Sequence, residues 1–275
     1  MAKNSGPRMR PDFGSFAGLM VALAGIMGGL LLEGGNIDDV TQATGAIIVL
    51  GGTIGAVMVT SPTAALVGAV RSLRLVFFQR AYDARKLVDD VLTFATRARR
   101  NGIVSLESDV DRIPDPFLRK ALGLAVDGTD VQDLQQIMHL EIDADERRSK
   151  TEARVFDAAG GYAPTVGIIG AVLGLIQVMK HLDQIEMVGH GIAVAFVATI
   201  YGVGSANILF LPAAAKLRAR AEEASRMKEL MLDGVTSIVQ GLHPKMIEQR
   251  LEPYLVEIGQ PTTKARARAI REEAA

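Results

Sequence analysis

The charged residues with the most suggestive spacing surround a single glycine. Three arginines precede Gly102 and one glutamate follows it in the stretch TRARRNGIVSLE. Arginines in the last turn of a helix complement its dipole, and an acidic residue can begin the next helix. The same charges could instead form a patch that binds a charged partner, and the spacing alone leaves both interpretations open. The residues are Arg97, Arg99, Arg100 and Glu107.

A second set of residues is suited to close helix packing in lipid. Small residues recur at helical spacing along two long apolar runs, residues 162–179 and 191–211. Such residues let helix backbones approach closely, which replaces the hydrophobic drive that lipid does not supply. Either they only pack helices together, or they line a narrow path inside an oligomer. The first run carries Gly167, Gly170, Ala171 and Gly174, and the second carries Gly191, Ala195, Thr199, Gly202 and Ala206.

Neither apolar run contains an Asp, Glu, Lys, Arg or His in its middle. A proton or ion that crosses here would therefore need a titratable group from another chain. We expect no metal or cofactor, because cysteine is absent and the four histidines show no metal-ligand spacing. The sequence has no phosphate-binding GxxxxGK[ST] loop and no Ser/His/Asp order, so we expect no enzyme. The net charge of −1 gives no basic field for nucleic acid.

Four stretches are long and apolar enough to cross a bilayer. At about 1.5 Å per residue the two runs are roughly 27–31 Å long, close to the thickness of the hydrocarbon core. Two further uncharged stretches cover residues 13–32 and 40–70, and the second is interrupted at Pro62. A content of 49% hydrophobic but only 5% aromatic residues argues against two soluble domains.

The basic residues set the expected orientation in the membrane. Lys and Arg cluster after the second and fourth stretches, whereas the short turns at residues 33–39 and 180–190 contain only Lys180. By the positive-inside rule both termini and the long middle segment are then cytoplasmic. The clusters are Arg71, Arg74, Arg80, Arg85 and Lys86 after the second stretch, and Lys216, Arg218 and Arg220 after the fourth.

The resulting fold class is an all-α integral membrane protein. It has four transmembrane helices in two hairpins, with a helical cytoplasmic domain between spans two and three. We expect a cytoplasmic N-terminus (residues 1–12), a first hairpin (13–61), a cytoplasmic helical domain (62–160), a second hairpin (161–215), cytoplasmic C-terminal helices (216–258) and a disordered tail (259–275).

Start and stop signals divide the expected cytoplasmic parts. Gly102 ends one predicted helix, Pro116 lies near the start of another, and Thr129-Asp130 caps a third over residues 131–159. No strand pattern is evident. After the membrane, the fourth helix continues to about Asp233, and a short helix opened by a proline covers residues 244–254.

Three ordered motifs carry a family resemblance. They are APTVGIIGAVLGLI at residues 163–176, GIAVAFVATIYG at 191–202 and NILFLPAAAKL at 207–217. With them the chain resembles the MotA-type stator subunits of the bacterial flagellar motor, within the MotA/TolQ/ExbB proton channel family. The resemblance covers residues 13–255.

The resemblance implies a function and partners. A stator subunit forms, with a B-type partner that supplies a membrane aspartate, an ion channel whose flux drives torque on the rotor switch protein. In the family the subunit is a homo-oligomer, a pentamer around a B-subunit dimer, in the bacterial inner membrane. No nucleic acid is involved. Because Ala171 stands where sodium-driven members tend to carry Thr, we expect protons to be the ion.

The resemblance also assigns roles to individual positions. The rotor interface is expected at Arg97, Arg99, Arg100 and Glu107, of which Arg99 and Glu107 match the family's arginine and glutamate. Pro164 and Pro212 match the two prolines implicated in coupling ion passage to cytoplasmic movement, although each could simply start or stop a helix at a membrane boundary. The second hairpin lines the pore, and its expected ion pathway comprises Ala171, Thr199, Gly167, Gly174, Ala195 and Gly202.

Two alternatives remain from the sequence. A TolQ- or ExbB-like subunit that energises an envelope process shares the paired-helix core, but that branch typically has three spans, and the first hairpin argues against it. A small-solute transporter would more usually show broken helices and an internal repeat. Here the two halves differ, because one hairpin precedes the middle segment and the other follows it.

Overall fold

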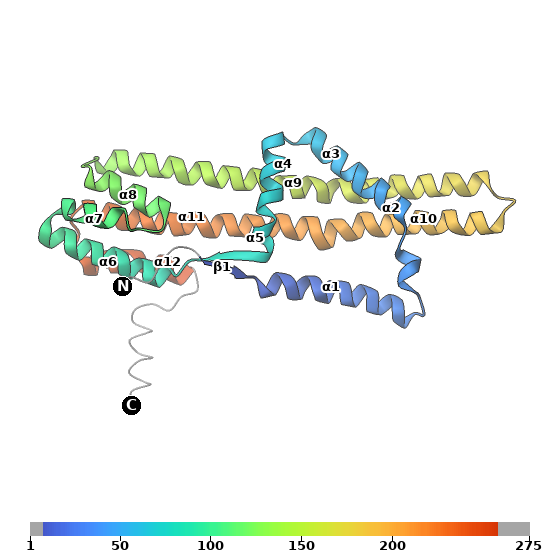
Figure 1. Ribbon diagram of the computed structural model, residues 1–275, viewed down its shortest axis with the longest axis horizontal. Helices are drawn as coiled ribbons and strands as arrows, with labels where there is room; N and C mark the ends of the chain where they lie inside the picture. The colour runs from blue at the N-terminus through green and yellow to red at the C-terminus, as the bar shows by residue number, and fades with distance from the viewer. Residues whose placement is uncertain (1–7, 258–275) are drawn as a thin grey trace, which may run out of the picture. The chain divides into compact units, whose positions relative to one another are not determined.

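The computed structural model describes residues 8–257 and is built almost entirely from helices (Figure 1). The tail expected to be disordered, residues 259–275, and residues 1–7 lie outside the described residues. The chain divides into two compact units, each made of segments that are far apart in the sequence. We call residues 11–79 with 148–219 the apolar unit, and residues 8–10, 80–147 and 220–257 the charged unit.

The predicted fold class is confirmed by four helical stretches that are long and apolar enough to cross a membrane. The first is α1 (Phe13–Leu32), which has no buried residue within the described part of the chain. A helix that is apolar all round and unburied needs lipid or another chain against it. The four stretches are Phe13–Leu32, Ile37–Thr60, Val131–Lys180 and Ile185–Val239.

The second stretch is segmented. After α1 the chain forms a 3₁₀ turn, η1, and then three consecutive helical pieces with a π-helical turn in the middle. The break predicted at Pro62 is confirmed, because α3 ends at Thr60 and the next helix begins at Thr63. The segments are η1 (Ile37–Val40), α2 (Ala43–Ala46), η2 (Ile47–Gly51), α3 (Gly52–Thr60), α4 (Thr63–Ser72) and α5 (Arg74–Phe77).

The third and fourth stretches are longer than the sequence suggested. The helix expected to end near Ala159 continues as α9 (Val131–Lys180), through the Gly160-Gly161 pair. Glycine weakens a helix interior but ends a helix only in a left-handed conformation, and neither glycine has a positive φ. The fourth helix begins at Ile185 instead of Gly191, so the turn after Lys180 is shorter than predicted. It comprises α10 (Ile185–Gly204), a π-helical η4 (Ser205–Phe210) and α11 (Leu211–Val239), which passes the predicted end at Asp233.

The charged unit packs short helices around one hydrophobic core. Leucines 106, 122, 134, 230 and 251 are fully buried in it. The predicted stop at Gly102 is confirmed by its φ of 80°, and the predicted start near Pro116 by Asp115, whose carboxylate accepts from the Phe117 and Leu118 N–H groups at 2.9 and 3.1 Å. The helices are α6 (Ala84–Asn101), η3 (Ile103–Leu106), α7 (Glu107–Val110), α8 (Pro116–Val126) and α12 (Pro244–Glu257).

The expectation of no strand was wrong. The segments β1 (Arg8–Pro11) and β2 (Phe78–Ala81) pair as a two-stranded sheet. Each strand has only four residues, too few for an alternating pattern to stand out in a sequence.

Candidate functional sites

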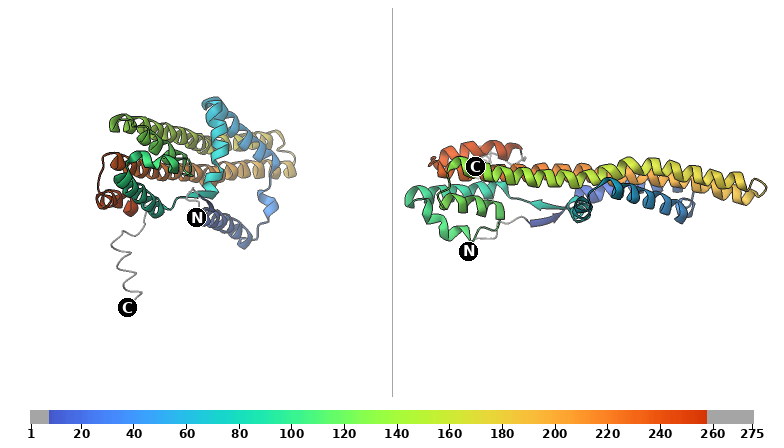
Figure 2. Two further views of the ribbon diagram at one scale, coloured as in Figure 1. Left: turned by 60° about the vertical axis from the view of Figure 1, so that its left-hand side comes forward. Right: turned by 90° about the horizontal axis from the view of Figure 1, so that it is seen from above.

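The hairpin of α9 and α10 is closed by direct backbone contact, and the two helices run side by side in Figures 1 and 2. A Cβ atom added at Gly174 would lie 2.8 Å from the Gly191 carbonyl oxygen and 2.9 Å from the Ala195 nitrogen. One added at Gly167 would lie 3.0 Å from the Ala198 carbonyl oxygen, and one at Gly202 would lie 2.6 Å from that of Ala163. The small residues are therefore required for this packing.

This contact also involves four residues of the expected ion pathway. Gly167, Gly174 and Gly202 are buried between the two helices, and Ala195 is only 6% exposed. Within one protomer these residues pack against the other helix of the hairpin. The sequence could not separate the two interpretations, because both require small residues at the same helical spacing.

Ala171 and Thr199 differ from those four residues, because both are half-buried on the hairpin. The Thr199 hydroxyl donates to the Ala195 carbonyl oxygen at 3.1 Å, and its oxygen can still accept a hydrogen bond. Ala171 offers only a methyl group. The two positions thus present one side-chain oxygen between them.

A tyrosine that the sequence analysis did not single out joins the second and fourth stretches. The Tyr201 hydroxyl donates to the Val40 carbonyl oxygen at 2.6 Å and accepts from the Gln42 N–H at 3.1 Å. These are the backbone groups between η1 and α2. Backbone groups outside a helix cannot stay unpaired in a bilayer. A lone tyrosine in an apolar run was the only signal for this role.

The two prolines differ in their place on a helix: Pro164 neither starts nor stops one, whereas Pro212 lies in a first turn. Pro164 lies inside α9, and Pro212 is the second residue of α11, directly after the π-helical η4. A proline in a helix removes one N–H and crowds the carbonyl four residues earlier. A π-helical turn opens the hydrogen-bond ladder and can accommodate such a defect.

An ion pair in the apolar unit lies one helical turn beyond Pro212. The Lys216 ammonium is 2.6 Å from the Asp12 carboxylate, and the two side chains are 32% and 10% exposed. The same carboxylate accepts from the Ser15 N–H at the start of α1, and the Asp12 N–H donates to the Phe77 carbonyl oxygen at 2.8 Å. Asp12 therefore ties together α1, α5 and α11.

The charged patch lies where α6 ends and α7 begins. Arg97 forms an ion pair with Asp109, so it is already engaged. Arg99, Arg100 and Glu107 are exposed, and within residues 8–257 no hydrogen bond or ion pair is found for their side chains. The structure therefore leaves three of the four expected rotor-interface charges available to a partner.

The patch has two sides. Arg97 and Arg100 lie with Thr93 and Thr96 along one side of α6, whereas Arg99 lies beside Ala95 and Ala98 at a separate cavity. Within the described residues, no three His, Asp or Glu side chains gather closely enough to hold a metal ion.

Comparisons with known proteins agree with this architecture. Residues 16–101 match the "Motility protein A N-terminal" family and residues 109–230 match the "MotA/TolQ/ExbB proton channel family". Motility protein A of Bacillus subtilis is 34% identical over 245 residues, covering 89% of this chain and 91% of that protein.

Two solved stator structures are also similar to this fold. The MotAB structure of C. jejuni superimposes with a TM-score of 0.85 at 29% identity, covering 89% of this chain and 96% of that one. The flagellar MotAB stator complex of Bacillus subtilis gives a TM-score of 0.83 at 34% identity, covering 93% and 98%. This chain therefore belongs to the MotA/TolQ/ExbB proton channel family, as a motility protein A type subunit of the flagellar motor stator.

Proposed function

We propose that this chain forms the wall of a proton-driven stator channel and delivers torque through the exposed charges after α6. Copies of the chain form a ring, a pentamer as the family resemblance implies, around a B-type partner that supplies a membrane aspartate. The observation that carries this proposal is the α9–α10 hairpin. Its small residues are used in internal packing, and residues 191–211 hold no acidic or basic side chain, so the group that binds the ion comes from another chain.

Ala171 and Thr199 are the pathway residues we retain. A proton needs only a carboxylate and a water or hydroxyl to pass it on, whereas sodium sheds its water only where several oxygens replace it. The single Thr199 hydroxyl at these two positions suits the proton. Motor speed at fixed membrane potential should therefore be unchanged when external sodium is replaced by choline. A speed that follows sodium would contradict this assignment.

Coupling is assigned to Pro164, Pro212 and the ion pair that follows Pro212. An elementary charge that falls through about 150 mV releases about 3.5 kcal/mol. Exposed ion pairs contribute about 0.2–1 kcal/mol each, so one ion supplies enough free energy to rearrange several such contacts. We place the bend at the π-helical η4 and Pro212, where the helical hydrogen bonds are weakest. The Asp12–Lys216 ion pair follows this bend, so the distance between its two side chains should change when the helix bends.

Torque is delivered at Arg99, Arg100 and Glu107, whose exposed charges are free to face a charged rotor protein. Arg97 instead supports this patch through its pair with Asp109.

The protein lies in the inner membrane with both termini, the middle segment 62–160 and residues 216–258 in the cytoplasm. We assign it no catalytic residue. Because the chain contains no cysteine, single cysteines at Asn36 and Gln184 should label from outside intact cells, and one at Ser108 should not.

The decisive experiment measures proton flux in liposomes. The chain alone should conduct no more than empty liposomes, and flux should appear when a B-type partner with its membrane aspartate is co-reconstituted. A partner carrying Asn in place of that aspartate is the matched control. Conductance by this chain without a partner would refute the proposed division of roles.

A further inference from the structure

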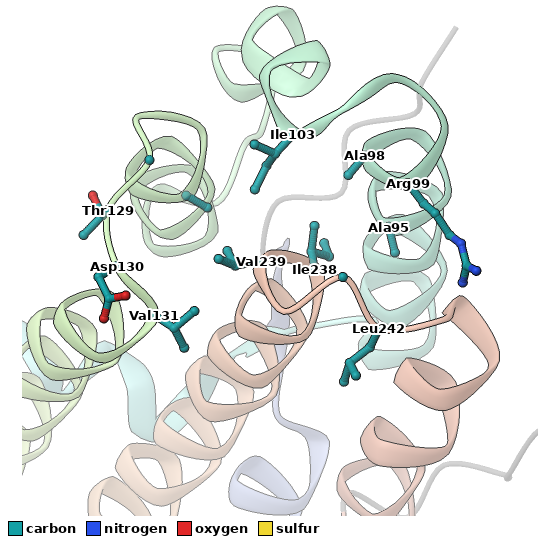
Figure 3. Close-up of a pocket in the computed structure, with 13 residues that line it drawn as sticks. Ala95, Ala98, Arg99, Ile103, Thr129, Asp130, Val131, Ile238, Val239 and Leu242 are labelled. Atoms are coloured by element: carbon teal, nitrogen blue, oxygen red, sulfur yellow. The ribbon is translucent and has the colours of Figure 1, made fainter.

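The charged unit contains an open cavity of about 440 Å³ beside Arg99 (Figure 3). Its wall is mostly apolar and comes from five elements, α6, η3, α8, α9 and α11, and from the turns between them. Ligand-binding pockets measure about 300–1,000 Å³. The cavity therefore has the size of a binding pocket. Apolar side chains in its wall include Ala95, Ala98, Ile103, Val131, Ile238 and Val239.

Two glycine turns shape this cavity. Gly128 and Gly241 both line it, and both have a left-handed backbone, with φ values of 79° and 69°. They reverse the direction of the chain after α8 and after α11. The ends of these two helices therefore lie at the sides of the cavity and do not cover its opening. The cavity is thus a consequence of how the helices end.

The rim of the cavity carries one charge of each sign. Figure 3 shows Arg99 on the α6 side and Asp130 on the opposite side, in the turn before α9. No partner of Arg99 is found within the described residues, and it is exposed. The Asp130 carboxylate accepts from the Gln132 N–H at 2.9 Å but is also exposed, so it can pair with a second group.

We propose that this cavity is an anchor pocket that receives an apolar side chain of the rotor protein. The rotor segment carries a carboxylate that faces Arg99 and a basic group that faces Asp130, one on each side of the apolar residue. This inference rests on the proposed function, because it adds to the same patch. The arrangement of charges on the rim selects such a bipolar segment and fixes its direction.

The physical need for an anchor follows from the exposure of the charges. Exposed ion pairs are screened by salt and contribute little to affinity, although they orient a partner and speed its approach. Binding energy in protein interfaces is concentrated where an apolar side chain fills a desolvated pocket. Arg99 therefore supplies direction, and the pocket beside it supplies most of the affinity.

The first test fills the pocket without changing any charge. Ala98→Leu replaces a methyl group of the wall with an isobutyl group, and Ala144→Leu makes the same change at an exposed position of α9 that does not line the cavity. With fluorescently tagged stators, Ala98→Leu should lower recruitment to motors about tenfold, and Ala144→Leu should change it less than about twofold. Membrane level and partner-dependent proton flux should be unchanged for both.

The second test removes part of the cavity wall. It replaces the first test if Ala98→Leu lowers the amount of protein in the membrane. Ile103→Ala widens the pocket, whereas Val104→Ala removes a neighbouring side chain that is 63% exposed and does not line it. Only Ile103→Ala should lower recruitment. Equal recruitment of the two variants would overturn the anchor pocket.

The third test separates charge from helix capping at Asp130. Asparagine caps helices as well as aspartate does, so Asp130→Asn removes only the charge. Asp130→Asn should therefore lower recruitment by itself, and swimming revertants of Asp130→Lys should carry basic-to-acidic changes in the rotor protein.

The outcomes distinguish the anchor pocket from the proposed function. If Arg99→Glu abolishes recruitment while Ala98→Leu leaves it at the level of Ala144→Leu, the anchor pocket is refuted and the charged rotor interface stands. If neither Arg99→Glu nor Ala98→Leu changes recruitment or rotation, the rotor interface itself is also refuted.

Discussion

Substitution of Gly202 tests whether the α9–α10 hairpin is closed by its backbones. A Cβ atom at this position would lie 2.6 Å from the Ala163 carbonyl oxygen and 3.0 Å from the Gly167 Cα atom. These are backbone atoms of the opposite helix, so no side chain can rotate away. Gly202→Ala must push the two helices apart locally by roughly half an ångström or more.

The expected cost follows from the loss of contact. A gap of about 0.5–1 Å forfeits a quarter to a half of the dispersion energy of each atom pair along the seam, and overpacking of a tight site costs about 1–3 kcal/mol. Gly204 is the matched control, because a Cβ atom there would meet nothing within 4 Å. Gly204→Ala should instead stabilise the helix by up to about 1 kcal/mol, since alanine is the better helix former.

Thermal unfolding of the detergent-solubilised protein measures this difference. For a chain of this size a change of about 1 kcal/mol shifts Tm by about 2–4 °C, so Gly202→Ala should melt several degrees below Gly204→Ala. If the two variants melt together while Gly202→Ala loses only ion flux, Gly202 lines the pathway and our account of the packing is wrong.

Three further predictions follow from the ion pairs and the charged patch. Arg99→Glu should impair rotation in a swimming assay while leaving stator assembly and membrane level intact, because this side chain has no ion pair among the described residues to lose. Asp12→Asn keeps a side chain that can cap α1 but loses the ion pair with Lys216, so it should lower Tm by a few degrees, and less than Asp12→Ala does. Burial, with the nearby Asp233 carboxylate, raises the pKa of Tyr254 from 10.0 to about 12. The stability that this protonated hydroxyl contributes is therefore complete below pH 10 and is lost as the pH rises from 10 to about 12. Tyr254→Phe should weaken the dependence of unfolding on pH in that window.

Helix boundaries were predictable where short-range chemistry decides them. Gly102 adopts the left-handed conformation expected of a stop, and Asp115 caps the helix that Pro116 begins. In both cases the deciding atoms lie within a few residues of each other. The break at Pro62 belongs to the same class, because proline restricts the residue before it.

Features that depend on distant residues were not predictable. The Gly160-Gly161 pair looked like a break, but a Cβ atom at Gly160 would lie 2.5 Å from the side chain of Leu211, so the glycine makes room for a neighbouring helix. Likewise the small-residue positions could be identified, but not which of them face a helix of the same chain. The π-helical η4 before Pro212 has no recognisable signature in the sequence.

The bond between Tyr201 and the backbone near α2 has a consequence for how the protein is made. Val40 and Tyr201 are 161 residues apart, so at a synthesis rate of about 5–20 residues per second roughly 10–30 s separate their appearance. During that interval the Val40 carbonyl and the Gln42 N–H lack their native partner, and burying them in lipid would be costly. We therefore expect the start of the second stretch to settle at its native depth only after α10 has inserted, which makes the fourth stretch a template for the second during biogenesis.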